Sequence, residues 1–148
     1  MKFIKPFHGD VEITQNFDDE RYRQTYAQYN SKHYGIDFAV PYSSPVLAAA
    51  DGKVWFSGDG AEEPLVGSQG GLSVILHHGS YLTMYCHLSE LHCTKDDQVT
   101  AGQLIGLCGD TGLTTGAHLH FSVMPVPLDF SGPYLCFVDP VPLIEGAL

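Results

Sequence analysis

The fold is decided by the stretch Leu72-Ser73-Val74-Ile75-Leu76-His77-His78-Gly79-Ser80-Tyr81-Leu82-Thr83-Met84-Tyr85-Cys86-His87. Two short apolar runs, Leu72–His77 and Tyr81–His87, are rich in residues that favour β-strands. The three residues between them include Gly79 and are typical of a hairpin turn. The stretch therefore predicts a pair of antiparallel strands.

Similar short runs recur on both sides of this hairpin, separated by many of the sixteen glycines and nine prolines. Such spacing predicts an all-β domain, a small antiparallel sandwich or barrel with long loops. Gly58–Gly71 is predicted to be a long surface loop. Asp18–Tyr29 is polar and without a clear apolar stripe, so a helix and a loop both remain open. The other predicted strands are Gly35–Val40, Val46–Ala50, Lys53–Ser57, Gln103–Cys108 and His118–Met124.

Length and charge narrow the class of protein. No linker divides the 148 residues, so we expect one domain over residues 1–148. The formal net charge of −10 argues against a nucleic-acid partner and a polybasic membrane contact. No run approaches the ~20 apolar residues of a membrane span, and the first ten residues do not resemble a signal peptide.

The four cysteines form no Cys-x-x-Cys pair. We therefore expect no cysteine zinc cluster. They are predicted to be small buried hydrophobes and not catalytic, although one disulfide would also fit an oxidising compartment.

Eight histidines in an acidic chain suggest a metal site. His33 and Asp37 are an even number of residues apart, so on an extended chain an imidazole and a carboxylate point to one side. Both groups suit Zn²⁺, but this pattern alone also fits a surface hydrogen bond. His118 and His120 form a stronger pattern, because His-x-His on a strand places both rings on one face.

His87 lies at the end of a predicted strand, where a lone histidine is usually structural. Strand alternation places His87 opposite Cys86 and Leu88. If those two side chains face the core, His87 faces the open side of the sheet.

Taken together in this order, these sites resemble the lysostaphin-like metallopeptidases of peptidase family M23, which include LytM-type enzymes. The resemblance runs from about residue 11 to residue 141. It implies the lysostaphin-like form of the all-β fold, the duplicated hybrid motif. The matching segments are His33–Phe38, Pro45–Val54, Gly102–Gly106, Gly109–Phe121 and Phe137–Pro140.

By these motifs, the resemblance implies that His33, Asp37 and His120 bind one Zn²⁺ per chain. Three protein ligands leave a fourth position open, as catalytic zinc sites require. The resemblance also implies that His87 and His118 flank the reacting water as acid–base partners. Which of the two accepts the proton stays open.

The implied function is that of a zinc metalloendopeptidase that hydrolyses peptide bonds in the cross-links or stem peptides of peptidoglycan. Glycyl-glycine bridges and D-Ala to diamino-acid cross-links are both open as substrates. We expect a monomer that acts on the cell wall, in the periplasm or outside the cell. We also expect neither a separate wall-binding domain nor an inhibitory leader. A short enzyme of this kind resembles a phage or prophage endolysin, made in the cytoplasm and released, or a catalytic fragment of a larger protein.

One region departs from the family pattern. Ile13–Phe17 and the tyrosine-rich Tyr22–Tyr34 replace the family's glycine-rich first strand. We expect the substrate groove to be walled by three loops, Tyr22–Lys32, Gly58–Gly71 and Thr111–Ala117, since loops on a rigid scaffold commonly carry recognition.

Two other functions compete with this one. A non-catalytic domain of the same fold could dock on peptidoglycan or activate another hydrolase, but such domains lose metal ligands and all five key residues are present here. A lipoyl or biotinyl carrier would need a lysine at a hairpin tip. Lys53 lies in a predicted strand and Lys95 in a loop without that context.

Overall fold

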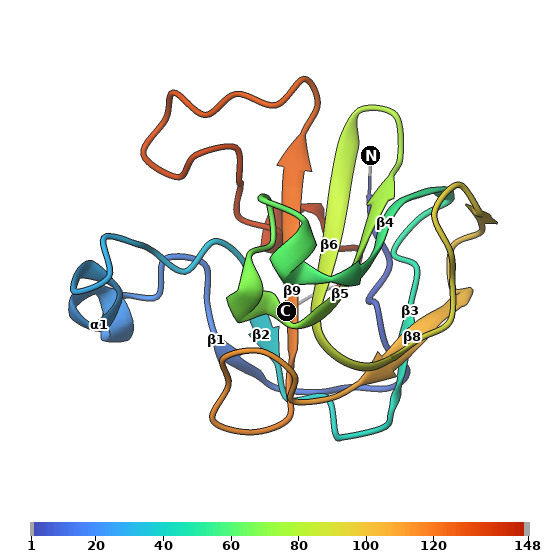
Figure 1. Ribbon diagram of the computed structural model, residues 1–148, viewed down its shortest axis with the longest axis horizontal. Coiled ribbons are helices and arrows are strands. Elements are labelled where there is room, and N and C mark those ends of the chain that lie inside the picture. Colours follow the sequence, from blue (N-terminus) through green and yellow to red (C-terminus); the bar gives the residue numbers. More distant parts are fainter. Residues whose placement is uncertain (1, 147–148) are drawn as a thin grey trace.

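A computed structural model describes residues 2–146, which form mostly antiparallel β-sheet (Figure 1). Within these residues the helical content is one five-residue helix and four single turns of 3₁₀-helix. The helical elements are α1 (Arg23–Ala27), η1 (Glu20–Tyr22), η2 (Gly60–Glu62), η3 (Ser68–Gly70) and η4 (Val141–Leu143). The strands are β1 (Ile13–Gln15), β2 (Ile36–Phe38), β3 (Pro45–Leu47), β4 (Gly52–Asp59), β5 (Leu72–His77), β6 (Tyr81–Leu91), β7 (Gln98–Val99), β8 (Leu104–Cys108) and β9 (Leu119–Pro125).

The sheet is organised around β6, the longest strand. The main path runs β1-β2-β9-β6-β5-β4-β7, and β8 pairs with both β3 and β6. The predicted hairpin is confirmed, because β5 and β6 pair antiparallel and the His78 N–H donates to the Tyr81 carbonyl at 2.9 Å. This topology places β2, β9 and β6 side by side, and these three strands carry the candidate site.

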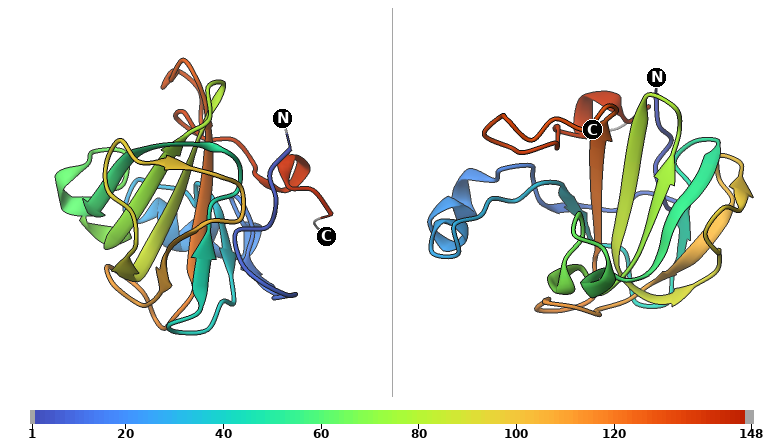
Figure 2. Two further views of the ribbon diagram at one scale, coloured as in Figure 1. Left: turned by 90° about the vertical axis from the view of Figure 1, so that its right-hand side faces the viewer. Right: turned by 45° about the horizontal axis from the view of Figure 1, so that its top comes forward.

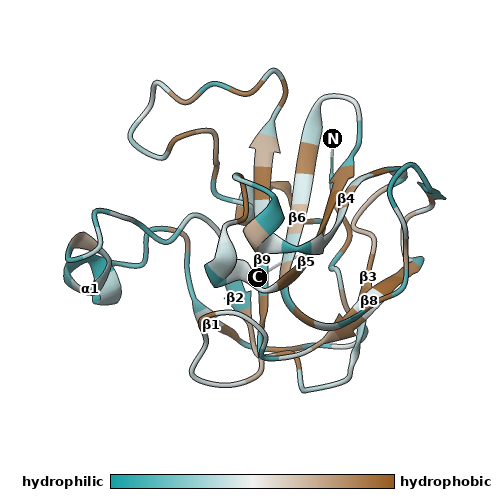
Figure 3. Cartoon of the chain, viewed as in Figure 1, coloured by the Kyte–Doolittle hydropathy of each residue, from teal (hydrophilic) through white to brown (hydrophobic). Residues whose placement is uncertain are grey.

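The core is divided between the two faces of the sheet. Tyr85 and Phe121 pack in a large cluster on one face, while Met84 and Met124 pack in a smaller cluster on the other. Neighbouring residues alternate between these clusters as expected for extended chain. Hydrophobic residues accordingly follow the strands, and the segment around α1 is largely hydrophilic (Figure 3).

All seven predicted strands are confirmed within a few residues, but the Asp18–Tyr29 segment is mostly not a helix. It contains only η1 and α1, and neither buries a residue. Without an apolar face to pack, a longer helix gains no tertiary stabilisation. The short strands β1 and β7 were not predicted.

The two ends of the described chain meet beside the sheet. Phe3 forms a parallel bridge with Ile144, and Figure 2 shows the termini on the same side of the molecule. In both figures the segment around α1 projects from the sheet, on the side of the loop that follows β9. None of the helices in residues 2–146 has the length and apolar character that a membrane span needs.

Candidate active site

Three of the predicted residues converge at one point on the sheet. Asp37 on β2 lies directly opposite His120 on β9 in the strand register, so both side chains stand on one face. His33 Nε2 lies 3.1 Å from Asp37 Oδ1, and His120 Nδ1 lies 2.9 Å from the same oxygen. One ligand atom from each residue falls within 4.8 Å of the others. His33 and Asp37 are both buried.

His33 reaches this point by a route that the sequence did not predict. The even offset from Asp37 assumed an extended chain, but β2 begins only at Ile36. His33 comes instead from the loop before the strand. Its Nδ1 lies 2.7 Å from the Asn16 carbonyl oxygen, and the Asp18 N–H donates to the His33 carbonyl at 2.8 Å. The loop is therefore fixed at both the ring and the backbone.

His118 immediately precedes β9, and its side chain reaches the same cluster. Its Nε2 lies 3.5 Å from Asp37 Oδ2, the oxygen less used by the other two histidines. The prediction that His118 and His120 point to one side is confirmed, because both rings approach Asp37.

His87 is placed by a local break in β6. Its φ of +65° lies in the left-handed region, and the register with β5 shifts by one residue there. Cys86 packs in the smaller cluster and Leu88 in the larger one, on opposite faces. The expectation that Cys86 and Leu88 share a face, opposite His87, was therefore wrong, since it assumed unbroken alternation. The break brings the ring of His87 to 4.7 Å from that of His118, centroid to centroid.

Each of the four rings is fixed by a second contact on its outer nitrogen. A backbone carbonyl can only accept, so three Nδ1 atoms must carry a proton and donate it. These donors belong to His33, His87 and His118, and their partners are the carbonyls of Asn16 (2.7 Å), Thr111 (2.8 Å) and Gly116 (3.0 Å). In the neutral rings Nε2 is therefore left unprotonated. Such outer contacts are what orient metal-binding histidines.

His120 has the opposite arrangement. Its Nε2 lies 2.8 Å from the Ser122 hydroxyl, which leaves Nδ1 toward Asp37. Ser122 is fully buried. A Cβ added at Gly35 would lie 2.6 Å from the Ser122 oxygen and 2.8 Å from His120 Nε2, so only glycine leaves room for this contact.

Burial and charge favour the protonation states that bind a metal ion. Burial by itself would raise the pKa of the Asp37 carboxyl, but hydrogen bonds and charges from His120 and His33 outweigh it and lower the pKa. Burial lowers the pKa of His120. Burial, together with the charge of His120, lowers the pKa of His87 to about 4. These shifts favour a carboxylate at Asp37 and neutral imidazoles at His87 and His120, the forms that can bind a metal ion or accept a proton.

The cysteines take no part in the cluster. All four are free thiols, and Cys86, Cys108 and Cys136 are buried as predicted, while Cys93 is partly buried. Cys86 pairs with His120 across the sheet, but burial raises the pKa of its thiol to about 12. A thiol of that pKa is not a nucleophile at neutral pH.

The loops predicted to wall a groove lie around this cluster in two groups. The loops before β5 and after β8 are tied together, since the Leu113 N–H donates to the Gln69 carbonyl and the Leu72 N–H to the Thr111 hydroxyl. On the other side, the tyrosine-rich segment encloses a hollow beside His33.

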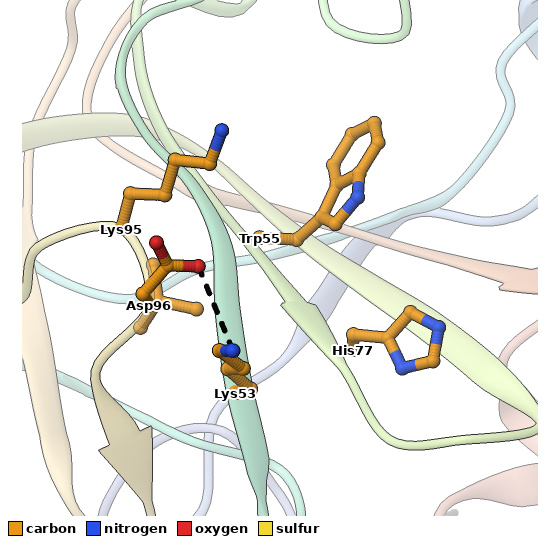
Figure 4. Close-up of a pocket in the computed structure, with 6 residues that line it drawn as sticks. Lys53, Trp55, His77, Lys95 and Asp96 are labelled. Atoms are coloured by element: carbon orange, nitrogen blue, oxygen red, sulfur yellow. Dashed lines mark ion pairs between the residues drawn. The ribbon is translucent and has the colours of Figure 1, made fainter.

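A different hollow lies at the far edge of the sheet (Figure 4). Trp55 and His77 line it, and an ion pair of 3.7 Å joins Lys53 to Asp96. None of the clustered residues lines this hollow, so it is separate from the candidate site.

Sequence reasoning did not single out several residues that build the site. Ser122 carried a usable signal, because it lies two residues after His120 and so on the same strand face. Asn16, Thr111 and Gly116 carried none, since they act through backbone carbonyls that every residue type has.

An antiparallel sheet with two histidines and one carboxylate around one point is typical of a mononuclear metal site. The profile of peptidase family M23 matches residues 31–129. This chain belongs to peptidase family M23.

Relatives share this domain across long parts of the chain. Peptidoglycan DD-endopeptidase ShyA of Vibrio cholerae is 36% identical over 120 residues, covering 80% of this chain and 26% of its own length. Glycyl-glycine endopeptidase ALE-1 of Staphylococcus capitis is 33% identical over 119 residues, covering 78% and 30% respectively. The crystal structure of a zinc containing peptidase from Vibrio cholerae superposes with a TM-score of 0.72 at 29% identity, covering 95% of this chain and 39% of that one. This chain therefore spans less than a third of these two curated relatives.

Proposed function

We propose that this chain is a zinc metalloendopeptidase that hydrolyses peptide bonds in the cross-links or stem peptides of bacterial peptidoglycan. The proposal is supported by family membership and by the names of relatives that act on peptidoglycan. It is also supported by the chemistry of the cluster around Asp37.

One observation carries the proposal. His33 donates its Nδ1–H to the Asn16 carbonyl, so its Nε2 faces the Asp37 carboxylate at 3.1 Å. The contact on the outer nitrogen holds the ring so that Nε2 stays aimed at the carboxylate. His120 Nδ1 approaches the same oxygen at 2.9 Å. Two imidazole nitrogens and one carboxylate oxygen are a donor set that suits Zn²⁺, and it leaves room for a fourth partner.

In this proposal His33, Asp37 and His120 hold one Zn²⁺. When bound, zinc lowers the pKa of a water molecule toward ~7 and polarises a carbonyl oxygen. The protein's own contribution is to orient the ligands through the contacts on their outer nitrogens and to keep the site largely buried.

His87 and His118 supply the proton transfers. With Nδ1 donating to a backbone carbonyl, each neutral ring presents an Nε2 that can accept a proton from the attacking water or return one. The water oxygen joins the acyl carbon, the C–N bond breaks, and the departing nitrogen takes a proton. The products are a carboxylic acid and an amine, so atoms balance without another reactant.

The test measures metal content and hydrolysis on the same samples. The purified chain should bind about one zinc per molecule and release soluble fragments from purified sacculi. A chelator should abolish release, and added zinc should restore it. Full activity of a sample that elemental analysis shows to be free of metal would refute the proposal, as would a zinc-loaded sample that releases nothing.

A further inference from the structure

Most of the residues that line the hollow beside His33 take no part in the cluster around Asp37. It measures about 360 Å³ and is lined by the segment between β1 and β2, including Asp18, Arg23, Tyr26 and Lys32. The ring of Tyr26 lies 5.7 Å from the ring of His33, so the hollow opens directly onto a proposed metal ligand. A substrate at the metal therefore has a neighbouring space for one of its side chains.

Both signs of charge line this hollow in fixed positions. Asp18 is mostly buried, and its Oδ2 accepts the Tyr134 hydroxyl at 2.9 Å and pairs with Arg23 at 3.4 Å. Lys32 Nζ donates to the Pro133 carbonyl at 3.0 Å and lies 4.9 Å from the centre of the Tyr134 ring. Pro133 and Tyr134, which are neighbours in the loop after β9, thus contact Lys32 and Asp18 respectively.

The Lys32 ammonium and the Asp18 carboxylate can each form further hydrogen bonds to a ligand. A lysine ammonium has three N–H donors, and one is used here. A carboxylate has two oxygens, and the Asp18 contacts within residues 2–146 use Oδ2. The neighbouring Asp19, by contrast, already accepts from Arg21 and from two backbone N–H groups, so its role is to cap the segment.

We infer that this hollow is a specificity pocket for a diamino-acid side chain that ends in both an ammonium and a carboxylate. In a cross-linked dimer this is the diamino acid of the stem whose own amine is not part of the cross-link. Lys32 would bind the carboxylate, Asp18 the ammonium, and the Tyr26 ring would cover the methylene groups between them and the backbone. A glycine bridge has no side chain and would leave the hollow unfilled. The chain is therefore assigned to cross-links made with such diamino acids and not to glycyl-glycine bonds, an assignment that rests on the proposed function.

The experiment compares kcat/KM of the zinc-loaded chain on four defined substrates. Three are cross-linked muropeptide dimers whose diamino acid has a free carboxylate, an amidated carboxylate, or lysine in its place. The fourth is pentaglycine. Loss of the carboxylate should lower kcat/KM by about tenfold to a hundredfold, as expected for losing one charged hydrogen bond. Pentaglycine should be cleaved more slowly still.

Two variants assign the effect to this pocket. Lys32→Met keeps most of the length of the side chain and removes its charge, so it should bring kcat/KM for the free and amidated dimers together. Lys95→Met, at the far edge of the sheet, should preserve the wild-type ratio. Asp18→Asn should lower kcat/KM for all three dimers, which carry a free side-chain ammonium, and leave that for pentaglycine unchanged. Zinc content is measured in each variant to show that the metal site is intact.

The outcomes separate this inference from the proposed function. Equal rates on the free and amidated dimers, an unchanged ratio in Lys32→Met, or preferred cleavage of pentaglycine would overturn the pocket while hydrolysis itself stands. If the zinc-loaded chain cleaves none of the four substrates, the proposed function is wrong and the pocket assignment is wrong with it.

Discussion

Two polar clusters in this molecule each contain histidine and differ in how their atoms meet. The Asp37 cluster consists of His33, Asp37, His118 and His120. The His78 chain runs from His78 through Thr83 to Tyr85. Both lie against β6 and its neighbours, yet only one of them has the arrangement of a binding site.

The His78 chain pairs every donor with an acceptor. His78 Nδ1 donates to the Asp51 carbonyl at 2.7 Å, so its Nε2 accepts the Thr83 hydroxyl at 2.8 Å. Thr83 in turn accepts the Tyr85 hydroxyl at 2.8 Å, and the Tyr85 oxygen accepts the Ala49 N–H at 3.0 Å. The order of protons is fixed along the whole chain, and no cation is needed.

In the Asp37 cluster, nitrogens of three histidines converge on one carboxylate. The outer nitrogens are satisfied by the protein. A network in which each donor has its own acceptor stabilises a fold, whereas several imidazoles that converge on one carboxylate also form a donor set that a cation can bind. Substitutions should therefore separate activity in one cluster from stability in the other.

The largest effect should come from Asp37→Asn. The amide keeps the size of the side chain and removes the charge, so zinc should be lost. Hydrolysis should fall at least about 10³-fold, since a catalytic metal contributes several kcal/mol. In chelator the variant should remain folded but be less stable than the wild type, because Asn cannot carry the charge that His33 and His120 favour. Elemental analysis, a sacculus assay and thermal unfolding measure these three quantities.

The matched control for Asp37→Asn is Asp96→Asn, at the far edge of the sheet, which should keep both zinc and activity. An Asp37→Asn protein that binds about one zinc and hydrolyses sacculi would contradict the assignment of Asp37 as a ligand.

Two adjacent histidines on one strand face sharpen the division of roles. His120→Ala should lose zinc and activity together, because only two protein ligands remain. His118→Ala should keep about one zinc and lower kcat by about 10²–10⁴-fold, the range for losing an acid–base or oxyanion partner. His87→Ala should behave like His118→Ala. Loss of zinc from His118→Ala, or full activity of that variant, would show that these roles are assigned wrongly.

A smaller effect is expected from Ser122→Ala. Removing the hydroxyl beside His120 Nε2 leaves the ligands in place and loosens one of them, so zinc affinity should fall by about 10–100-fold. Ser73→Ala is the control, since Ser73 is equally buried but its hydroxyl donates to the carbonyls of Gly70 and Gly71. Competition with a chelator of known affinity measures both. Equal zinc affinity in the two variants would remove Ser122 from the site.

The sheet and the clustered side chains could be predicted from the sequence, whereas the placement of His87 and the form of the tyrosine-rich segment could not, for physical reasons. Strand periodicity and the hairpin turn identified the sheet, and side-chain motifs identified the histidines and Asp37. The position of His87 depends on one left-handed residue within β6, and alternation cannot anticipate such a break. Thr111 orients His87 through a carbonyl, which leaves no trace in side-chain identity. The tyrosine-rich segment was ambiguous because it forms its structure around charges and has no apolar face.

The His78 chain should show the opposite behaviour from the site. Thr83→Val conserves the side chain's shape but leaves His78 Nε2 and the Tyr85 hydroxyl without their partner. Leaving buried polar groups without hydrogen-bond partners lowers the free energy of unfolding by about 1–3 kcal/mol. Zinc content and activity should be unchanged. Urea unfolding of this variant is compared with exposed Thr100→Val, and a loss of activity without a loss of stability would reverse the comparison.

The smallest effect is a pH dependence of stability. Burial lowers the pKa of His78, with His77 acting in the same direction and the Asp51 carbonyl and charge opposing it. The folded state therefore prefers the neutral ring, while the unfolded chain binds a proton below the usual pKa of about 6.5. Stability from this residue is complete above that pH and is lost as the pH falls, by at most about 1.4 kcal/mol per pH unit.

His78→Gln keeps a donor and an acceptor but does not titrate. In chelator, urea unfolding at pH 7.5 and 5.5 should show the larger loss in the wild type, because the other histidines are common to both proteins. Equal losses would mean that the proton order along the His78 chain does not affect stability.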